Sequence, residues 1–502
     1  MSIYQNIQDF VNIAINNGTV EAADEIYLRN QLLHFLGLHD WQSVQKDVPL
    51  RNSLELMDKL LEFAQKQGMY EPSERDFYEA ALMNFITPIP SKLNQAFWEK
   101  FQQNSKQATD YFYALAKQVN QVKTRDIAKN IEYLHPTKYG DLQITINLSK
   151  PEKDPKAIAA AKQLQLKDTS YPKCQLCMEN EGFYGGGNKA ARSNHRIVRL
   201  ELNGEKWGFQ YSPYAYFNEH AIVLNEKHQP MAIDHRCFNN LLAFLDQFPH
   251  YMIGSNADLP IVGGSILTHD HYQAGRHEFP MSKASLREAV RLKDFPNIEA
   301  GIVDWPMSVL RLRSENREAM ICAADEILSK WRSYDDLGLS IQARSADGVQ
   351  HHTITPIARK IACCYEMDLV LRDNNVSDAF PDGIFHPHAG LHHIKKENIG
   401  LIEVIGLAIL PARLKAELAE VEKFLLDLPN DVPDMHRDWA EWLKLIGGYE
   451  ADTVHEFVQQ AVGEVFTEVL QDAGVFKTDE AGQAGFHRFI DFLNANKNKE
   501  IV

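Results

Sequence analysis

The sequence predicts an α+β protein in which two strand-rich regions lie between helical ends. Apolar residues recur at every third or fourth position from residue 3 to about 138 and again from 414 onward, which is the period of amphipathic helices. Between these ends, apolar and polar residues alternate in short segments, which is the period of half-buried strands. The segments repeat weakly before and after residue 300, which indicates a duplicated α+β unit.

Four regions follow from these patterns. We expect a helical N-terminal region at 1–140, a first strand-rich unit at 141–300, a second at 301–413 and a helical C-terminal region at 414–502. The charged stretch SKPEKDPK at 149–156 lies close to the first boundary. Asn203-Gly204 between RIVRLEL and EKWGFQYS predicts a hairpin, because these two residues readily adopt the positive φ angles of a type I′ turn.

The other predicted elements are read from the same two periods. Strands are expected at DLQITINLSK, AIVLN, YMIGS, GGSILTHDH, MSVLRLR and EMDLVLRD, and helices at FNNLLAFLDQF and EAMICAADEILSKW.

Composition and charge narrow the class of protein. The 502-residue chain has 52 Lys and Arg against 68 Asp and Glu, and its net charge is -16. An acidic chain is repelled by long polyanions, so we expect no nucleic acid partner. No stretch has the roughly 18 uninterrupted apolar residues of a membrane helix, and the start carries no basic segment followed by an apolar run. We therefore expect no membrane partner and a cytoplasmic location.

The cysteines indicate a metal site rather than disulfides. Six cysteines in so long a chain do not suggest a disulfide framework, whereas Cys174 and Cys177 have the spacing with which two thiolates hold one zinc ion. A structural zinc site needs four ligands, and the best candidates for the other two are His228 and His269. A pair of core thiols is the alternative. The remaining cysteines are expected in the core: Cys237, Cys322, Cys363 and Cys364.

The segment GGSILTHDHYQAG ends in alternating polar residues. In an extended strand, His269, His271 and Gln273 would share one face, and Asp270 and Tyr272 would share the other. The glycines before them would let a ligand approach the backbone closely. A single histidine in a strand is usually structural, but two histidines and a glutamine behind two glycines favour a functional site.

A basic loop provides a candidate phosphate site. In GFYGGGNKAARSNHR, three glycines precede Lys189, Arg192 and Arg196. Unhindered backbone amides, ammonium and guanidinium groups are the donors that bind phosphate oxygens. A solvated loop is the alternative, and the spacing matches neither a Walker nor a dinucleotide-binding motif.

Taken in order, these motifs resemble those of the galactose-1-phosphate uridylyltransferases of the histidine-triad superfamily. The order is Cys-x-Leu-Cys, Asn180 with the basic glycine loop, a histidine that closes a strand, Gly-Gly-Ser, and His-x-His-x-Gln. The helical ends and HDHYQAG resemble the second, bacterial class of that family. The resemblance implies a duplicated histidine-triad-like antiparallel sheet core with helical N-terminal and C-terminal extensions.

The resemblance also implies roles for the central residues. His271 would be the nucleophile that takes a uridylyl group onto a ring nitrogen, and Gln273 would hydrogen-bond the α-phosphoryl oxygens. His269 would complete a structural zinc site with Cys174, Cys177 and His228.

Other motifs match less closely. Asn256 resembles a residue that contacts the nucleotide, and Gly264 and Ser265 resemble a phosphate-binding pair, although Ser265 lies one residue farther from the first histidine than in the better known class. His386 and His388 resemble ligands of an auxiliary iron in that class, but no glutamate partner is evident, so iron is not expected. The stretch NIGLIEVIGLAILPAR resembles a segment that lines the sugar site, yet most of its polar residues are missing.

The activity that the resemblance implies is uridylyl exchange between UDP-glucose and galactose 1-phosphate, through a covalent uridylyl-histidine in a ping-pong mechanism. The partners would be a nucleotide sugar and a hexose 1-phosphate, with a homodimer as the family's common assembly. A nucleotide-sugar or dinucleoside-polyphosphate phosphorylase or hydrolase of the same superfamily is one alternative, but Gln273 cannot donate a proton to a leaving group, which disfavours hydrolysis. A non-catalytic, zinc-containing module that binds a nucleotide sugar is the other.

Overall fold

The computed structural model describes residues 2–45, 49–149, 171–186, 189–264 and 266–495. The chain divides into two compact units, with 1–128 and 151–229 in unit 1 and 129–150 and 230–502 in unit 2. Of the predicted boundary stretch at 149–156, all but the first residue lies outside the described residues.

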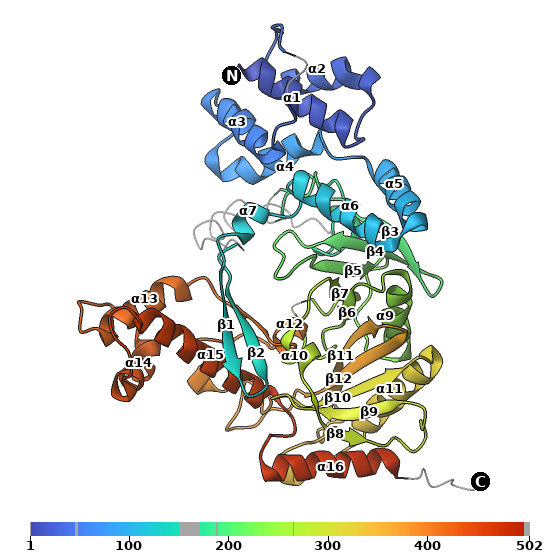
Figure 1. Cartoon of the computed structure of the whole chain (residues 1–502), viewed down its shortest axis with the longest axis vertical. Helices are drawn as coiled ribbons and strands as arrows, with labels where there is room; N and C mark the ends of the chain where they lie inside the picture. The colour runs from blue at the N-terminus through green and yellow to red at the C-terminus, as the bar shows by residue number, and fades with distance from the viewer. Residues whose placement is uncertain (1, 46–48, 150–170, 187–188, 265, 496–502) are drawn as a thin grey trace. The chain divides into compact units, whose positions relative to one another are not determined.

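Among the residues that the structure describes, unit 1 contains a series of helices followed by strands (Figure 1). Its elements are α1 (Ile3–Asn16), α2 (Glu25–Phe35), α3 (Ser53–Lys66), α4 (Arg75–Asn84), α5 (Pro90–Gln103), α6 (Ser105–Gln118), α7 (Thr124–Ile127), β3 (Val198–Leu202), β4 (Glu205–Tyr211) and β5 (Ala221–Asn225). Strands β3 and β4 form the predicted hairpin, in which Leu202 lies opposite Glu205. The turn residues Asn203 and Gly204 have φ angles of 52° and 80°, which confirms the reading of this dipeptide.

Unit 2 contains most of the strands and the C-terminal helices. Its strands are β1 (Ile131–Thr137), β2 (Gly140–Ile146), β6 (Met252–Gly254), β7 (His271–Gly275), β8 (Leu286–Val290), β9 (Glu299–Val303), β10 (Val309–Ser314), β11 (His352–Ile361), β12 (Cys364–Asp373) and β13 (Leu407–Leu410). Its helices are α9 (His235–Gln247), α10 (Pro280–Lys283), α11 (Arg317–Trp331), α12 (Leu401–Val404), α13 (Leu414–Leu425), α14 (Asp434–Ile446), α15 (Val454–Ala473) and α16 (Glu480–Asn494).

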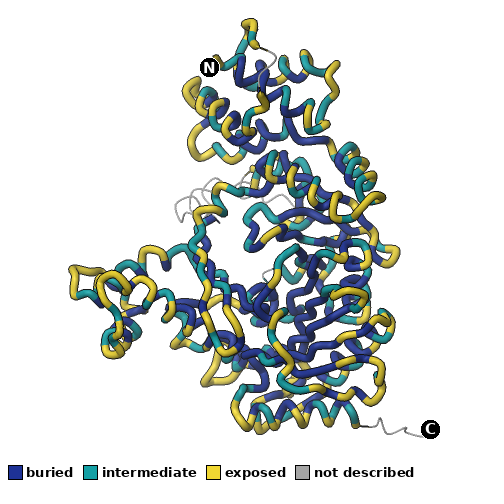
Figure 2. The backbone as a smooth tube through the Cα atoms, viewed as in Figure 1, coloured by how far each residue is buried: buried dark blue, intermediate teal, exposed yellow. Residues whose placement is uncertain are grey.

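An antiparallel sheet forms the centre of unit 2. Its strands follow the order β7-β6-β11-β12-β10-β9-β8, and a separate small sheet has the order β1-β2-β13. Helix α9 packs against β6 and β11, and α11 packs against β10, β11 and β12. The central strands β6, β11, β12 and β10 run through the buried interior of the unit in Figure 2, whereas the edge strand β8 is largely exposed or half-buried. Trp331 anchors α11, because its indole stacks on His352 at 4.0 Å and donates hydrogen bonds to two strand carbonyl oxygens.

The order of elements along the chain confirms an α+β fold with a duplicated unit. Three strands, a helix and two strands occur as β3, β4, β5, α9, β6, β7 and again as β8, β9, β10, α11, β11, β12. We call these the first and second repeats. Within the described part of the chain, no helix combines the length and apolar character needed to cross a bilayer.

Two expectations about local structure were wrong. The helical pattern does not extend to residue 138, because Ile131–Thr137 forms β1 and pairs antiparallel with β2 along its whole length. Pairing with a strand farther along the chain overrode the local signal. Cys237 is buried as expected. Cys322 is exposed on the surface of α11, Cys363 is exposed in the turn between β11 and β12, and Cys364 is half-buried at the start of β12.

Candidate active site

Strand β7 carries His271 and Gln273 on one face. It pairs antiparallel with β6, so that Gln273 lies opposite Gly254. The opposite face of the segment contacts α9: Asp270 pairs with Arg236 at 2.6 Å, and Asn240 donates to the hydroxyl of Tyr272 at 3.3 Å. The predicted division of this segment into two faces is therefore confirmed for the residues in β7.

The prediction that His269 lies in the same strand was wrong, because β7 begins only at His271. The backbone before it leaves the sheet and turns, and the Leu267 carbonyl accepts a hydrogen bond from the Met231 N–H instead of a strand partner. His269 is nevertheless fully buried. Its carbonyl oxygen contacts the His271 ring.

The hydrogen bond of His271 fixes its tautomer. Nδ1 lies 2.7 Å from the carbonyl oxygen of His269, and a carbonyl only accepts, so Nδ1 carries the proton in the neutral ring. The other nitrogen, Nε2, then carries a lone pair. Among the residues that the structure describes, Nε2 has no hydrogen-bond partner. The ring thus presents an unprotonated nitrogen that can act as a nucleophile.

Burial keeps this ring neutral. His271 is 6% exposed, and burial lowers its pKa to about 4, although the hydrogen bond to the His269 carbonyl acts in the opposite direction. At neutral pH almost every molecule therefore carries the nucleophilic form.

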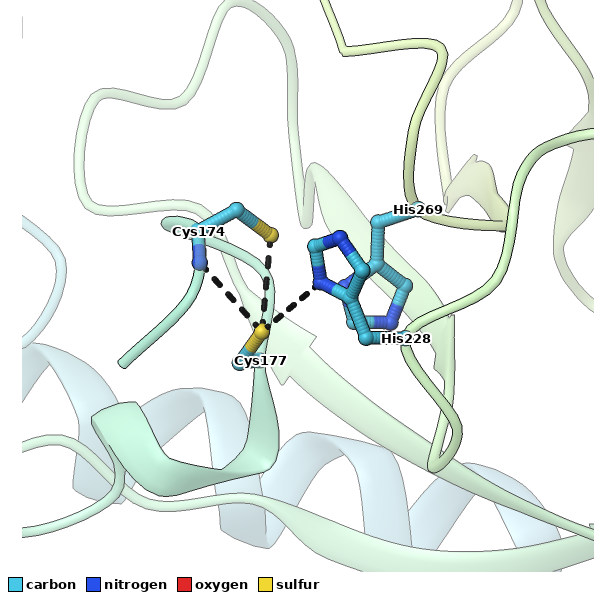
Figure 3. A group of neighbouring side chains, drawn as sticks. All are labelled: Cys174, Cys177, His228 and His269. Atoms are coloured by element: carbon cyan, nitrogen blue, oxygen red, sulfur yellow. Dashed lines mark hydrogen bonds between the residues drawn. The ribbon is translucent and has the colours of Figure 1, made fainter. Parts of the chain in front are cut away.

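Cys174, Cys177 and His228 lie together in unit 1. The two Sγ atoms are 3.6 Å apart, and Cys177 Sγ is 3.2 Å from His228 Nδ1. Asn180 holds the turn, because its amide donates to the carbonyl oxygens of both cysteines at 2.9 Å. With His269 these side chains make up the group drawn in Figure 3, a set that could hold a metal ion. Two thiolates and two imidazoles are a donor set that suits tetrahedral zinc.

Asn256 and Gly264, which were both predicted to contact the nucleotide, lie next to each other. The buried side chain of Asn256 accepts a hydrogen bond from the Leu401 N–H at 2.8 Å, which fixes its amide. A Cβ atom at Gly264 would lie 2.6 Å from the amide nitrogen of Asn256, so only glycine fits there. Ser265 lies outside the described residues.

The three basic residues of the loop, Lys189, Arg192 and Arg196, differ in their hydrogen-bond partners. All five N–H groups of Arg196 find acceptors: Pro88, Ser193, His195, Asn84 and Thr87. This arginine has no donor left for a phosphate, so we withdraw its predicted role. Lys189 donates to the carbonyl oxygens of Tyr171 and Pro172 at 2.9 and 3.0 Å.

Arg192 is the remaining basic residue of the loop. Burial lowers the pKa of its guanidinium, and no hydrogen bond to that group joins it to another described residue. A desolvated arginine without a fixed acceptor is suited to bind an anion.

The second His-x-His stretch is held by structural contacts. His388 lies 3.3 Å from Asp472 and 3.1 Å from the Ile384 carbonyl oxygen, and its ring stacks on Phe380 at 4.2 Å. Burial lowers the pKa of His386.

The sequence reading missed a buried charge network in the second repeat. Glu366 and Asp368 on β12 are completely buried. Arg311 donates to Asp368 at 2.6 and 3.0 Å, Arg359 contacts both carboxylates, and Arg313 contacts Glu366. Burial raises the pKa of Asp368, but Arg359 and Arg311 outweigh it and hold that pKa below its ordinary value. Charges at alternate positions of MSVLRLR and EMDLVLRD were the available signal.

Comparison with known proteins covers nearly the whole chain. The family model described as galactose-1-phosphate uridyl transferase matches with its N-terminal domain at 18–230 and its C-terminal domain at 244–441. A galactose-1-phosphate uridylyltransferase of Lactococcus lactis subsp. lactis is 67% identical over 98% of this chain and 100% of that protein. One of Enterococcus faecalis is 53% identical over 97% of this chain and 98% of the relative.

Among solved structures, a yeast Ap4A phosphorylase aligns with 67% of this chain and 92% of its own, with 12% identity and a TM-score of 0.33. The two matched family domains and the high identities to full-length relatives show which family the chain belongs to. The chain belongs to the galactose-1-phosphate uridylyltransferase family.

Proposed function

We propose that this chain transfers a uridylyl group between UDP-glucose and galactose 1-phosphate, giving glucose 1-phosphate and UDP-galactose, by way of a covalent bond to His271 Nε2. One observation carries the mechanism: His271 donates its Nδ1 proton to the His269 carbonyl, which leaves Nε2 with a lone pair in a buried, neutral ring. The names of the matched relatives supply the substrate class, since they state galactose 1-phosphate.

The first step forms an N–P bond and breaks a P–O bond. Nε2 attacks the α-phosphorus of UDP-glucose, and glucose 1-phosphate leaves as a phosphate that needs no proton. As the bond forms, the ring gains positive charge and the Nδ1 proton becomes a stronger donor. The His269 carbonyl oxygen, 2.7 Å away, therefore stabilises the transition state more than the ground state. A phosphate oxygen of galactose 1-phosphate then attacks the same phosphorus, which forms a P–O bond, breaks the N–P bond and restores the neutral ring.

Neighbouring donors would hold the nucleotide. Gln273 lies on the same strand face as His271 and offers amide N–H groups to the non-bridging oxygens. Asn256, fixed by the Leu401 N–H and packed on Gly264, would contact the nucleotide with Ser265. Arg192, and with it Lys189, would neutralise phosphate charge.

A burst experiment tests this function. Mixing the protein with UDP-glucose alone should release one equivalent of glucose 1-phosphate per active site and then stop, because the uridylyl group stays on the protein. Steady release of UMP would instead favour the hydrolase alternative, and phosphate-dependent turnover the phosphorylase. Binding of UDP-glucose without any release would favour the non-catalytic module.

We also propose that Cys174, Cys177, His228 and His269 hold one structural zinc ion. The proposal rests on the donor types and on the close approach of the two thiols to each other and to His228. A bound zinc would restrain the His269 side chain, and the backbone of that same residue orients the His271 ring. The ion would thus add rigidity, while all bonding changes occur at His271 and the substrates.

Elemental analysis tests the zinc proposal. The purified protein should contain about one zinc per chain, and Cys177→Ser should contain close to none. Cys322→Ser, at an exposed thiol, is the matched control and should keep the metal. A zinc content near zero in the well-folded wild-type protein would remove the proposal.

We propose a cytoplasmic location, which is supported by the six cysteines, all of them among the described residues, because none of them forms a disulfide. A homodimer remains a prediction from the family resemblance, and sedimentation equilibrium would check it.

A further inference from the structure

We propose that Glu315, Cys363 and Cys364 form a second metal site, which binds a thiophilic divalent cation such as Zn²⁺ or Cd²⁺ at the surface of unit 2. Their two Sγ atoms and one carboxylate oxygen all lie within 4.8 Å of one another. This site is independent of the proposed function, because none of its residues belongs to the proposed active site.

The sheet register brings the three residues together. Cys364 begins β12 and pairs with Ile361, the last residue of β11, across a turn in which Ala362 has a φ angle of 54°. On its other side β12 pairs with β10, so that Tyr365 lies opposite Ser314. Glu315 follows Ser314 directly and therefore reaches the hairpin turn.

A direct contact shows that the side chains converge. The Cys363 thiol donates a hydrogen bond to Glu315 Oε1 at 2.9 Å. Two ten-residue strands and their neighbours hold these positions, so little backbone ordering is needed when a cation binds. Both Glu315 and Cys363 are exposed, which gives a cation access from solvent.

The donor set selects the class of cation. Two thiolates and one carboxylate favour zinc and cadmium over magnesium or calcium, which prefer oxygen ligands alone. Three protein ligands leave a fourth tetrahedral position for water. Binding replaces the two thiol protons by metal–sulfur bonds, so two protons leave for each cation bound and apparent affinity rises with pH.

Cadmium titration of the reduced, full-length protein in its purified metal-loaded form tests the site. Thiolate-to-cadmium charge-transfer absorbance should show one more equivalent bound by the wild type than by the Cys363→Ser/Cys364→Ser double variant. Cys322→Ser should bind as the wild type does. Cys174 and Cys177 are present in every variant, so the difference does not depend on the zinc proposal above.

Glu315→Gln should weaken the additional cadmium site at least about tenfold, because it removes a charged ligand. All these variants should keep their exchange activity within about twofold, which reports that the protein is folded. Equal cadmium stoichiometry in the wild type and the double variant would overturn the site. Unchanged affinity in Glu315→Gln would overturn the three-ligand assignment.

Discussion

The last strands of the two repeats, β7 and β12, carry different chemistry at corresponding places. Each has two polar side chains two residues apart: His271 and Gln273 on β7, Glu366 and Asp368 on β12. Gln273 lies opposite Gly254 and Asp368 lies opposite Ile357. Because Gly254 and Ile357 are themselves paired, the two polar pairs occupy matching positions in the sheet.

The partners of these residues differ. In β12 three arginines surround the two carboxylates, and each carboxylate accepts at least two of their contacts. In β7 the ring of His271 bonds only through Nδ1 within the described part of the chain, and Nε2 keeps its lone pair. Two polar residues at matching places of a repeated fold are therefore structural or reactive according to their hydrogen-bond partners.

The largest expected effect is on the reactive strand. His271→Ala should lower the rate of uridylyl exchange by at least about 10³-fold, because the attacking nitrogen is lost. Rates from a coupled assay measure the loss, and circular dichroism should show an unchanged fold. His487→Ala, at an exposed ring, is the matched control and should retain full activity. Exchange at near wild-type rate in His271→Ala would refute the covalent mechanism.

The corresponding change on the structural strand should affect stability instead. Asp368→Asn removes the charge that compensates Arg311 and Arg359, and we expect it to lower the free energy of unfolding by about 3–5 kcal/mol. Urea denaturation measures this, with the exposed Asp452→Asn as the control. The exchange rate per folded molecule should stay within a few-fold. A stable variant without activity would show that β12 takes part in the reaction and would contradict its structural role.

The pH dependence should separate a buried ring from an ordinary one. Because burial lowers the pKa of His271 to about 4, single-turnover uridylylation should stay constant from pH 8 to about 5. Below the pKa the rate should fall about tenfold per pH unit, since protonation removes the lone pair. The stability that the neutral ring contributes should likewise be lost as pH falls from about 6.5 to 4. A decline that begins near pH 6.5 would mean that the ring is not buried.

The smallest effect is expected at the second His-x-His stretch. His388→Ala removes the contact with Asp472 and the stacking on Phe380, which should cost about 1–2 kcal/mol of stability. Exchange should change by less than about threefold. Thermal unfolding and the coupled assay measure the two effects. A loss of activity as large as that of His271→Ala would contradict the structural role of His388 and show that it takes part in the reaction.

Local patterns predicted much of this organisation. Asn203-Gly204 gave the hairpin because its backbone preferences are local, and the period of AIVLN gave β5. Short motifs were also enough to select Cys174, Cys177 and His271 as candidate site residues. These features depend on few residues and on no distant contact.

Other features depend on distant contacts and could not be predicted. Strand β1 forms because β2 pairs with it, and Arg196 is occupied by acceptors as far away in sequence as Asn84. His269 lies outside the strand that was predicted to contain it, because the segment before β7 turns. In each case the partner that decided the structure lies outside the window that a sequence pattern samples.

Peptide mass spectrometry after a brief incubation with UDP-glucose shows directly whether a covalent bond forms and at which residue. We expect one uridylyl group per chain, attached to the peptide that contains His271 and absent from the His271→Ala variant. A uridylyl group on any other residue, or continued exchange without any covalent adduct, would contradict it.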